Sequence, residues 1–301
     1  MDSHNSTYGH FYAIMTIFIW GTTFVSTKLL LIDFSPLEIL FLRFTLGLAA
    51  LYAINTHKLI LKEAKHLFYI IAAGLCGITL YFLLENIALT YTTAANVGII
   101  VTVAPILTAL FSQIIFKEDK LTTTFFIGFI LAISGVFIIS FKDVSVTINP
   151  TGDILAFLAS CVWAVYSILC KKIASFGYNT IQTTRDSFLY GIILMIPAIY
   201  ISPISFTADK ILDPVNAFNL LYLGLGASAM CFVTWNIAVK ILGPLKTSAY
   251  IYAVPVVTIT TSYIFLSEKI TFTTVSGTVL ILLGLLLSEN KLKLKSTAIA
   301  K

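Results

Sequence analysis

The chain has 301 residues, of which 58% are hydrophobic and 11% are charged, and its mean hydropathy is +0.96. Soluble globular domains are nearer half apolar and a quarter charged, so this composition excludes a soluble domain and a disordered chain. The net charge of +5 does not indicate a nucleic-acid partner, because the 19 Lys and Arg residues are spread thinly along the chain. The composition predicts an all-α integral membrane protein surrounded by the lipid bilayer.

Apolar stretches long enough to cross a bilayer, about 20 residues each, recur along the whole chain. Ten are found: 10–31, 35–54, 67–89, 94–116, 121–141, 153–172, 183–203, 217–239, 247–266 and 271–289. They leave short loops and no room for a soluble domain. Any functional site is therefore expected inside a bundle of ten transmembrane helices.

The distribution of Lys and Arg predicts the orientation of these helices. With the N-terminus in the cytoplasm, the inner loops and the tail 291–301 hold 13 Lys residues, whereas the outer loops hold 3. Cytoplasmic loops carry the excess of positive charge in membrane proteins. We therefore expect both termini, and the basic tail, on the cytoplasmic side. The first stretch is expected to be retained, since no signal-peptide cleavage site follows it.

Matches at constant spacing indicate an internal repeat. Three of them lie 150 residues apart: Asn86-Ile87-Ala88 with Asn236-Ile237-Ala238, Pro105 with Pro255, and Glu118 with Glu268. Three more lie 143 residues apart: Gly9 with Gly152, Trp20 with Trp163, and Lys28 with Lys171. The chain is expected to consist of two five-helix repeats, 8–142 and 151–290. Because five is odd, the second repeat is inverted in the membrane, as is typical of secondary transporters with a midplane site.

Small residues predict where these helices pack closely. Gly128 and Gly135 lie seven residues apart on one face of the fifth helix, and Gly277 and Gly284 repeat this spacing on the tenth. The second and seventh helices align poorly. Their best match is Gly47 with Gly191.

Residues in both halves resemble a known family. The run Trp20-Gly21-Thr22-Thr23-Phe24, the junction 88–94, and Pro105 followed by Glu118 resemble EamA-type transporters of the drug/metabolite transporter superfamily. The resemblance covers nearly the whole chain. It implies a carrier in the bacterial inner (plasma) membrane, usually an exporter of amino acids or related small metabolites.

Aromatic residues near the middle of the helices are candidates for a substrate cavity. Trp20 and Trp163 hold equivalent repeat positions, away from the membrane interface where Trp usually lies. Their ring faces can stack on a solute or hold a cation, and helix packing is the alternative. Four further aromatic residues extend the set: Trp235, Tyr81, Tyr166 and Tyr250. Plain packing explains these four equally well.

Among the charged residues of the spans, Glu85 and Arg43 are functional candidates, because an ionisable group within the membrane costs about 3 kcal/mol or more. Glu85 is a candidate to bind a substrate amine or to carry a proton. Its alternatives are a structural ion pair with Lys28, Arg43 or Arg185, or exposure at the outer rim. Arg43 is a candidate to bind a substrate carboxylate, with a structural partner on another helix as the alternative.

Four residues are candidates for hinges or gates. Pro105 and Pro255 each remove one intrahelical hydrogen bond, so the carbonyl four residues earlier is expected to lose its partner and the helix to kink. Asn86 and Asn236 are amides within the membrane, suited either to gating or to hydrogen bonding between helices.

Other features of the sequence argue against metal binding, ATP hydrolysis and enzymatic catalysis. The four Cys residues lack metal-ligand spacing, the four His residues lie outside or at the edge of the spans, and no phosphate-binding loop for ATP is present. We therefore expect no cofactor, no metal and no enzymatic activity, but a small-molecule substrate with protons as a candidate coupling ion. The alternatives are a non-transporting membrane partner or sensor and, less favoured, a membrane enzyme. The oligomeric state is left open.

Overall fold

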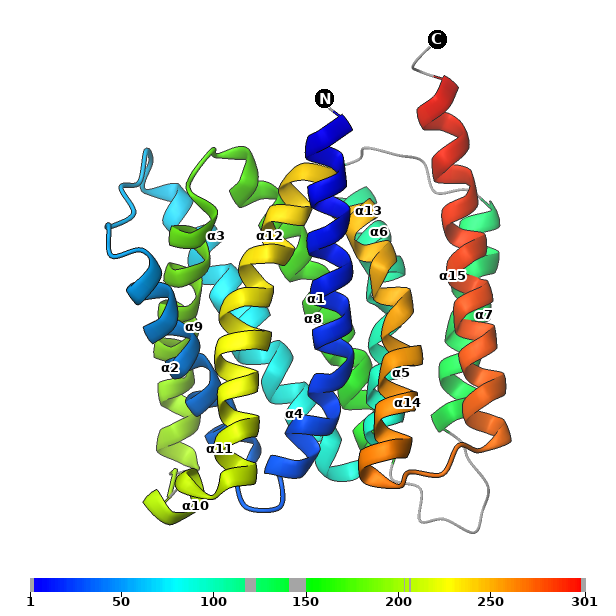
Figure 1. Ribbon diagram of the computed structural model, residues 1–301. Coiled ribbons are helices and arrows are strands. Elements are labelled where there is room, and N and C mark those ends of the chain that lie inside the picture. The colour runs from blue at the N-terminus through cyan, green and yellow to red at the C-terminus, as the bar shows by residue number, and fades with distance from the viewer. Residues whose placement is uncertain (1–2, 117–122, 141–149, 203, 206, 299–301) are drawn as a thin grey trace.

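The computed structural model describes residues 3–116, 123–140, 150–202, 204–205 and 207–298, and these residues form helices and loops without a strand. The expected all-α class is therefore confirmed. The helices run up and down through one bundle, and α1 begins at the end of the bundle where α15 finishes (Figure 1). Glu118 of the expected repeat lies outside the described residues.

The first half of the chain forms α1 (Ser3–Leu30), α2 (Pro36–Ile54), α3 (Lys65–Gly74), η1 (Leu75–Leu80), α4 (Tyr81–Tyr91), α5 (Ala94–Ile100), η2 (Val101–Val103), α6 (Ala104–Phe116) and α7 (Thr123–Ser140). The second half forms α8 (Pro150–Ser175), α9 (Thr180–Ile201), α10 (Ala208–Leu212), α11 (Pro214–Leu221), η3 (Tyr222–Met230), α12 (Cys231–Leu242), α13 (Pro244–Ser248), η4 (Ala249–Ala253), α14 (Val254–Leu266) and α15 (Phe272–Ala298). The segments η1 and η3 are π-helical, and η2 and η4 are 3-10 helical.

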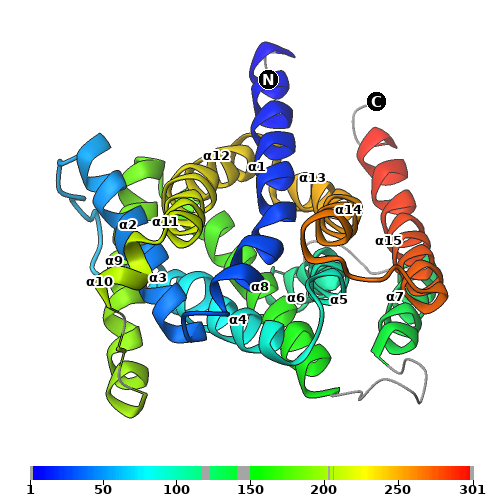
Figure 2. The same ribbon diagram turned by 60° about the horizontal axis from the view of Figure 1, so that its bottom comes forward.

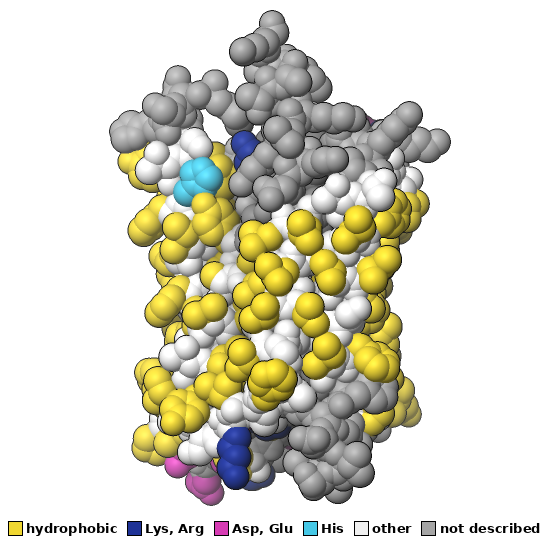
Figure 3. All heavy atoms as spheres, turned by 90° about the vertical axis from the view of Figure 1, so that its right-hand side faces the viewer, with side chains coloured by type: hydrophobic (Ala, Val, Ile, Leu, Met, Phe, Trp, Pro, Cys, Tyr) yellow, Lys and Arg dark blue, Asp and Glu magenta, His cyan; other side chains and the backbone are white. Residues whose placement is uncertain are grey.

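Eight helical stretches of the described residues are long and apolar enough to cross a bilayer. α7 and α15 contribute shorter apolar stretches, Thr123–Gly135 and Phe272–Gly284. The chain is a multi-pass helical membrane protein, whereas the number of ten crossings stays a prediction. Figure 3 shows the side of the molecule formed by α7 and α15, where apolar side chains cover the middle and the visible charged ones lie at the ends. This distribution fits a surface in contact with lipid, because charges are costly at bilayer depth.

Several helices begin where the sequence supplies a side-chain cap. Ser35 accepts a hydrogen bond from the N–H of Glu38, and the Glu38 carboxylate accepts one from the N–H of Ser35, which makes a capping box in front of α2. The side chains of Thr93 and Asn179 accept hydrogen bonds from N–H groups in the first turns of α5 and α9, without a reciprocal bond. These side chains satisfy N–H groups at helix ends that have no partner within the helix.

Element boundaries recur between the two halves. α4 begins at Tyr81 and α12 at Cys231, while α6 begins at Ala104 and α14 at Val254. A π-helical segment precedes both α4 and α12, and a 3-10 segment precedes both α6 and α14. The same interruptions of the helical hydrogen-bond pattern therefore occur at the spacing that relates Pro105 to Pro255.

The prolines lie in the first turns of α6 and α14, directly after the 3-10 segments. The carbonyls of Val101 and Ile251 lack the N–H four residues later, because that residue is proline, but each accepts a hydrogen bond from the N–H three residues later. A 3-10 turn moves the acceptor to this earlier donor and so compensates for the N–H that proline lacks.

The two halves of the chain are interleaved. α1 packs against α12 and α14 of the second half, and α8 packs against α4 and α6 of the first half. Figure 2 shows α1 and α8 among helices of both halves, with α7 and α15 paired at the edge of the bundle. Contacts between the halves therefore form the interior of the molecule.

Glycines allow the backbones to approach closely between α7 and α15. A Cβ atom on Gly135 would lie 2.6 Å from the carbonyl oxygen of Gly277, and a Cβ atom on Gly284 would lie 2.5 Å from the carbonyl oxygen of Gly128. The predicted close packing of these glycines is confirmed. The two contacts are reciprocal. In the repeat, Gly128 corresponds to Gly277 and Gly135 to Gly284, so exchanging the two halves turns one contact into the other.

A second reciprocal pair of contacts joins α2 to η3 and α9 to α3. A Cβ atom on Gly47 would lie 3.1 Å from the carbonyl oxygen of Gly224, and a Cβ atom on Gly191 would lie 3.0 Å from that of Gly74. Gly47 and Gly191, the best match between the poorly aligned helices, thus have equivalent surroundings.

We expect Gly135→Ala to lower the free energy of unfolding by about 1–3 kcal/mol, because the added methyl group meets a backbone oxygen that moves only if α15 moves. Gly226→Ala is the matched control, since its Cβ would meet only a Tyr222 ring carbon at 3.8 Å. Unfolding of the purified variants in mixed micelles measures the difference. Equal stability of the two variants would contradict this interpretation of the α7–α15 contact.

Candidate functional site

Three tryptophans meet inside the bundle. The ring centroids of Trp20 on α1 and Trp163 on α8 lie 5.3 Å apart, and Trp235 on α12 lies 5.1 Å from Trp20 and 6.2 Å from Trp163. Tyr81 and Tyr166 lie 4.8 Å and 4.9 Å from Trp163. The structure thus brings together five of the aromatic residues that the sequence suggests.

A pocket lies beside this aromatic cluster, between α1, α4 and α8, and is named the central pocket below. Its walls include Trp20, Phe24, Tyr81, Phe82, Glu85 and Trp163. Glu85 is the only charged residue among those that line it. The pocket therefore combines aromatic ring faces with a single carboxylate.

Glu85 is 1% exposed, and its Oε1 atom accepts a hydrogen bond from no described group. The alternative of exposure at the outer rim is therefore wrong. Tyr81 hydrogen-bonds to this carboxylate and Arg43 attracts it, but no salt bridge joins it to a described Lys or Arg. Since a buried carboxylate oxygen without a hydrogen-bond partner is costly, Oε1 offers a strong acceptor to any donor that enters the pocket.

Arg43 on α2 is fully buried and lines neither of the two pockets described in this section. Its Nε donates to the hydroxyl of Ser228 at 3.1 Å, so it has the expected partner on another helical element. The guanidinium lies 4.3 Å from the ring centroid of Phe82 and 5.2 Å from that of Phe44. Nη1 and Nη2 donate to no described group. Arg43 thus packs against Phe82, which lines the central pocket, without itself forming part of its wall.

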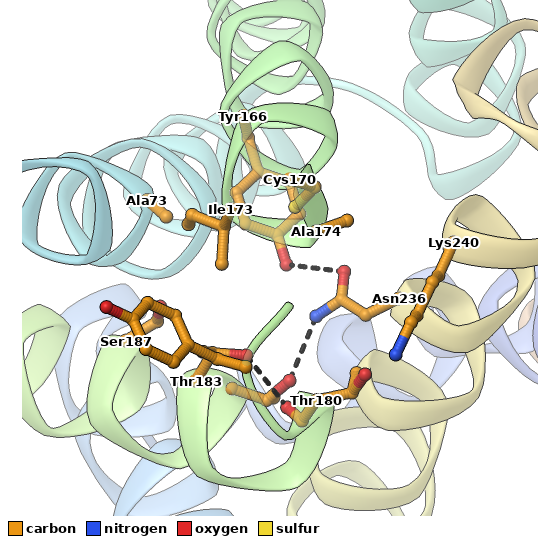
Figure 4. A pocket seen from close by; sticks show the side chains of 12 residues that line it. Ala73, Tyr166, Cys170, Ile173, Ala174, Thr180, Thr183, Ser187, Asn236 and Lys240 are labelled. Carbon is orange, nitrogen blue, oxygen red and sulfur yellow. Dashed lines mark hydrogen bonds between the residues drawn. The ribbon is translucent and has the colours of Figure 1, made fainter. Parts of the chain in front are cut away.

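A second pocket, named the polar pocket, lies between α8, α9 and α12 (Figure 4). Its polar lining comprises Tyr166, Tyr178, Thr180, Thr183, Thr184, Ser187, Asn236 and Lys240. The Asn236 amide donates to the Thr184 hydroxyl at 3.0 Å and accepts a long hydrogen bond from the Tyr166 hydroxyl at 3.5 Å. Asn236 therefore connects α12 to both other walls.

The remaining candidates lie at different places. Tyr250 lines neither pocket, and its hydroxyl is hydrogen-bonded to Nδ1 of His10 at 2.5 Å. Trp235 is fully buried and also lines neither pocket. Asn86 donates to the carbonyl of Pro36 at 3.1 Å and ties α4 to α2. Hydrogen bonding between helices is confirmed for Asn86, as for Asn236, while their gating role stays a prediction.

The polar pocket is the feature that the sequence-based search missed. Its signal is the spacing of Thr180, Thr183, Thr184 and Ser187, which places four hydroxyls on one face of α9. Such a row of hydroxyls in a membrane helix indicates that the helix turns this side to a cavity or to a polar neighbour.

The helical fold and its pockets define a polytopic membrane protein with two pockets between its helices. The profile of the EamA-like transporter family matches residues 7–141 and 150–289. The chain belongs to this family.

Several relatives are similar over nearly their whole length. An uncharacterized transporter of Archaeoglobus fulgidus is 27% identical over 288 residues, covering 94% of this chain and 97% of the relative. The uncharacterized transporter YyaM of Bacillus subtilis is 26% identical over 283 residues, covering 91% of each chain. A "Probable terminal-alkyne amino-acid exporter" of Streptantibioticus cattleyicolor is 23% identical over 257 residues, covering 85% of this chain and 84% of the relative.

A solved crystal structure shares the fold with a TM-score of 0.64 at 19% sequence identity, covering 96% of this chain and 97% of the other. At this identity the likeness concerns the fold alone.

The indole N–H groups of Trp20 and Trp235 differ in their hydrogen bonding, and the stability of variants tests this difference. Trp20 Nε1 donates to the carbonyl of Ala227 at 2.9 Å, whereas Trp235 Nε1 is buried and donates to no described group. We expect Trp20→Phe to be more destabilising than Trp235→Phe by about 1 kcal/mol, because both lose similar volume but only the first loses a hydrogen bond. Chemical unfolding in micelles compares the two. The reverse order would refute this assignment of the indole hydrogen bonds.

Proposed function

We propose that the chain is a secondary transporter that exports amino acids or related small metabolites by alternating access. Membership of the EamA-like family and the relatives named as transporters support transport in general. The relative named as an amino-acid exporter supports the substrate class. In this proposal the central pocket holds the solute between the two halves of the chain.

The observation that carries the proposal is the state of Glu85. A fully buried carboxylate with one oxygen unbonded, enclosed by Trp20, Trp163 and Tyr81, matches the requirements of an ammonium group. The carboxylate supplies charge and hydrogen-bond acceptors, and the ring faces attract the cation. A proton can occupy the same oxygen, so binding of solute and proton at Glu85 would be mutually exclusive, which gives a simple route to proton antiport.

The architecture proposed for this cycle is two inverted five-helix repeats, 8–142 and 151–290, with ten crossings. The two matched ranges of the family profile, the recurring π-helical and 3-10 segments, and the reciprocal glycine contacts support it. Two similar halves in opposite orientation have two related packings, one open to each side of the membrane. The proposed hinges between these packings are Pro105 and Pro255, each next to a 3-10 segment. The proposed gates are Asn86 and Asn236, which form hydrogen bonds between helices.

The proposed location is the inner membrane of a bacterial cell, with both termini in the cytoplasm. The presence of bacterial transporters among the relatives supports the assignment to the inner membrane. The excess of Lys in the loops assigned to the cytoplasmic side supports the orientation.

We expect the rate of transport and its pH dependence to require Glu85. Proteoliposomes loaded with a mixed pool of amino acids and metabolites should release specific members, faster with an inward proton gradient. Glu85→Gln should lower flux about tenfold or more, because a charge-assisted hydrogen bond of roughly 1.5–3 kcal/mol is lost, and the remaining flux should no longer depend on pH.

Glu38→Gln is the matched control for this substitution. Glu38 is also buried, but its carboxylate already accepts hydrogen bonds from the N–H groups of Ser35 and Ser205 at 2.7 Å and 2.6 Å, and it lines neither pocket. Its loss should leave the pH dependence of flux unchanged. Wild-type pH dependence in an active Glu85→Gln protein would remove Glu85 from proton coupling, and the absence of any flux from the wild type would count against the transporter proposal.

A further inference from the structure

The polar pocket differs from the central pocket in the sign of its charge. Lys240 is the only charged residue among those that line the polar pocket, whereas Glu85 is the only charged residue among those that line the central pocket. No salt bridge joins Lys240 to a described Asp or Glu. Figure 4 shows its side chain extending along the pocket, with the ammonium group on the side of Thr180. The first turn of α9, which begins at Thr180, adds the positive end of its helix dipole at the same place.

Hydroxyl groups on α9 supply hydrogen-bond donors to this pocket. Ser187 is 6% exposed, and its hydroxyl is hydrogen-bonded to no described group. Thr184 is 2% exposed and accepts from Asn236, so its own hydroxyl proton remains free to be donated. Buried hydroxyls of this kind normally have partners, so hydroxyl donors in a pocket that also contains a cation are suited to anionic oxygens.

Tyr166 separates the two pockets. Its ring belongs to the lining of the polar pocket and lies 4.9 Å from the ring of Trp163, which lines the central pocket. The two pockets therefore lie on the two sides of one aromatic wall, and the charged groups in their linings have opposite signs.

We propose that the polar pocket is a binding site for the carboxylate group of the transported solute, with Lys240 providing the charge and Thr184 and Ser187 donating hydrogen bonds. This inference rests on the proposed transport function and adds a second site to it. The sequence suggests Arg43 for this role. The structure places Arg43 outside the walls of both pockets, whereas Lys240, an exposed residue, belongs to the lining of one of them.

Equilibrium binding to the purified full chain in nanodiscs of zwitterionic lipid tests the proposal without requiring transport. Three probes share one phenylethyl body: 3-phenylpropionate carries only the carboxylate, phenethylamine only the ammonium group, and L-phenylalanine both. We expect Lys240→Gln to weaken binding of the two carboxylates about tenfold and to leave phenethylamine unchanged, since a hydrogen bond to a charged group is lost only for the former. Lys240→Arg should retain most of the affinity.

Two further variants keep the test specific. Ser187→Ala removes a donor that has no other described partner, so it should weaken carboxylate binding about threefold without lowering the melting temperature. Lys246→Gln removes the same charge from α13, at a residue that is also exposed but lies outside the pocket lining, and should change nothing.

Several results would overturn the proposal: no binding of either carboxylate to the wild type, equal affinity in Lys240→Gln, an equal loss for phenethylamine, or an equal effect of Lys246→Gln. Failure of this site is distinguishable from failure of the transport proposal. If the wild type transports solute but Lys240→Gln binds carboxylates as tightly as the wild type, only the proposed site is refuted. If Lys240→Gln weakens carboxylate binding but the wild type transports nothing, only the transport proposal is refuted.

Discussion

The rest of the structure depends on the close approach of backbones at glycine pairs. Within a bilayer, apolar side chains gain little by leaving lipid for another helix, so tight van der Waals packing must hold the helices together. Gly135 with Gly277 and Gly47 with Gly224 provide such contacts, and each has a reciprocal counterpart in the other half of the chain. All of them join the first half to the second. The halves are therefore held against each other more tightly than two independent domains, and any rearrangement must slide or rotate these interfaces together.

Polar residues break the symmetry that the packing establishes. At the spacing that pairs the two asparagines, Glu85 corresponds to Trp235 and Lys240 to Thr90. Phe82 and Phe232, which share that spacing, instead lie 6.0 Å apart as a matched pair at the centre. The shared aromatic framework can serve both halves, but each ionic group exists only once. A transporter built in this way would have two similar packings that differ in the charge presented to the solute, which is a structural basis for direction and selectivity.

The sequence predicts the helices well and the pockets poorly, for physical reasons. The bilayer requires long apolar helices, and a repeat leaves identical residues at constant spacing, so both can be recognised directly. The lining of a pocket depends on which face each helix turns to its neighbours. The π-helical segments η1 and η3 shift the helical phase just before α4 and α12, so a regular period carried forward from α3 or α11 does not place Glu85 or Asn236. Trp235 and Tyr166 illustrate the consequence, since both join the aromatic cluster but only Tyr166 reaches a pocket.

The position of Arg43 has a consequence for the proposed cycle. A fully buried guanidinium that makes one side-chain hydrogen bond and packs on Phe82 and Phe44 needs a compensating negative charge, and Glu85 is the acidic group that attracts it. An ammonium group in the central pocket would share Glu85 with Arg43. When such a solute leaves, the attraction between the Glu85 carboxylate and the Arg43 guanidinium remains, so the empty site does not contain an isolated buried charge. The arginine would thus act as a permanent counter-charge that lowers the cost of emptying the pocket.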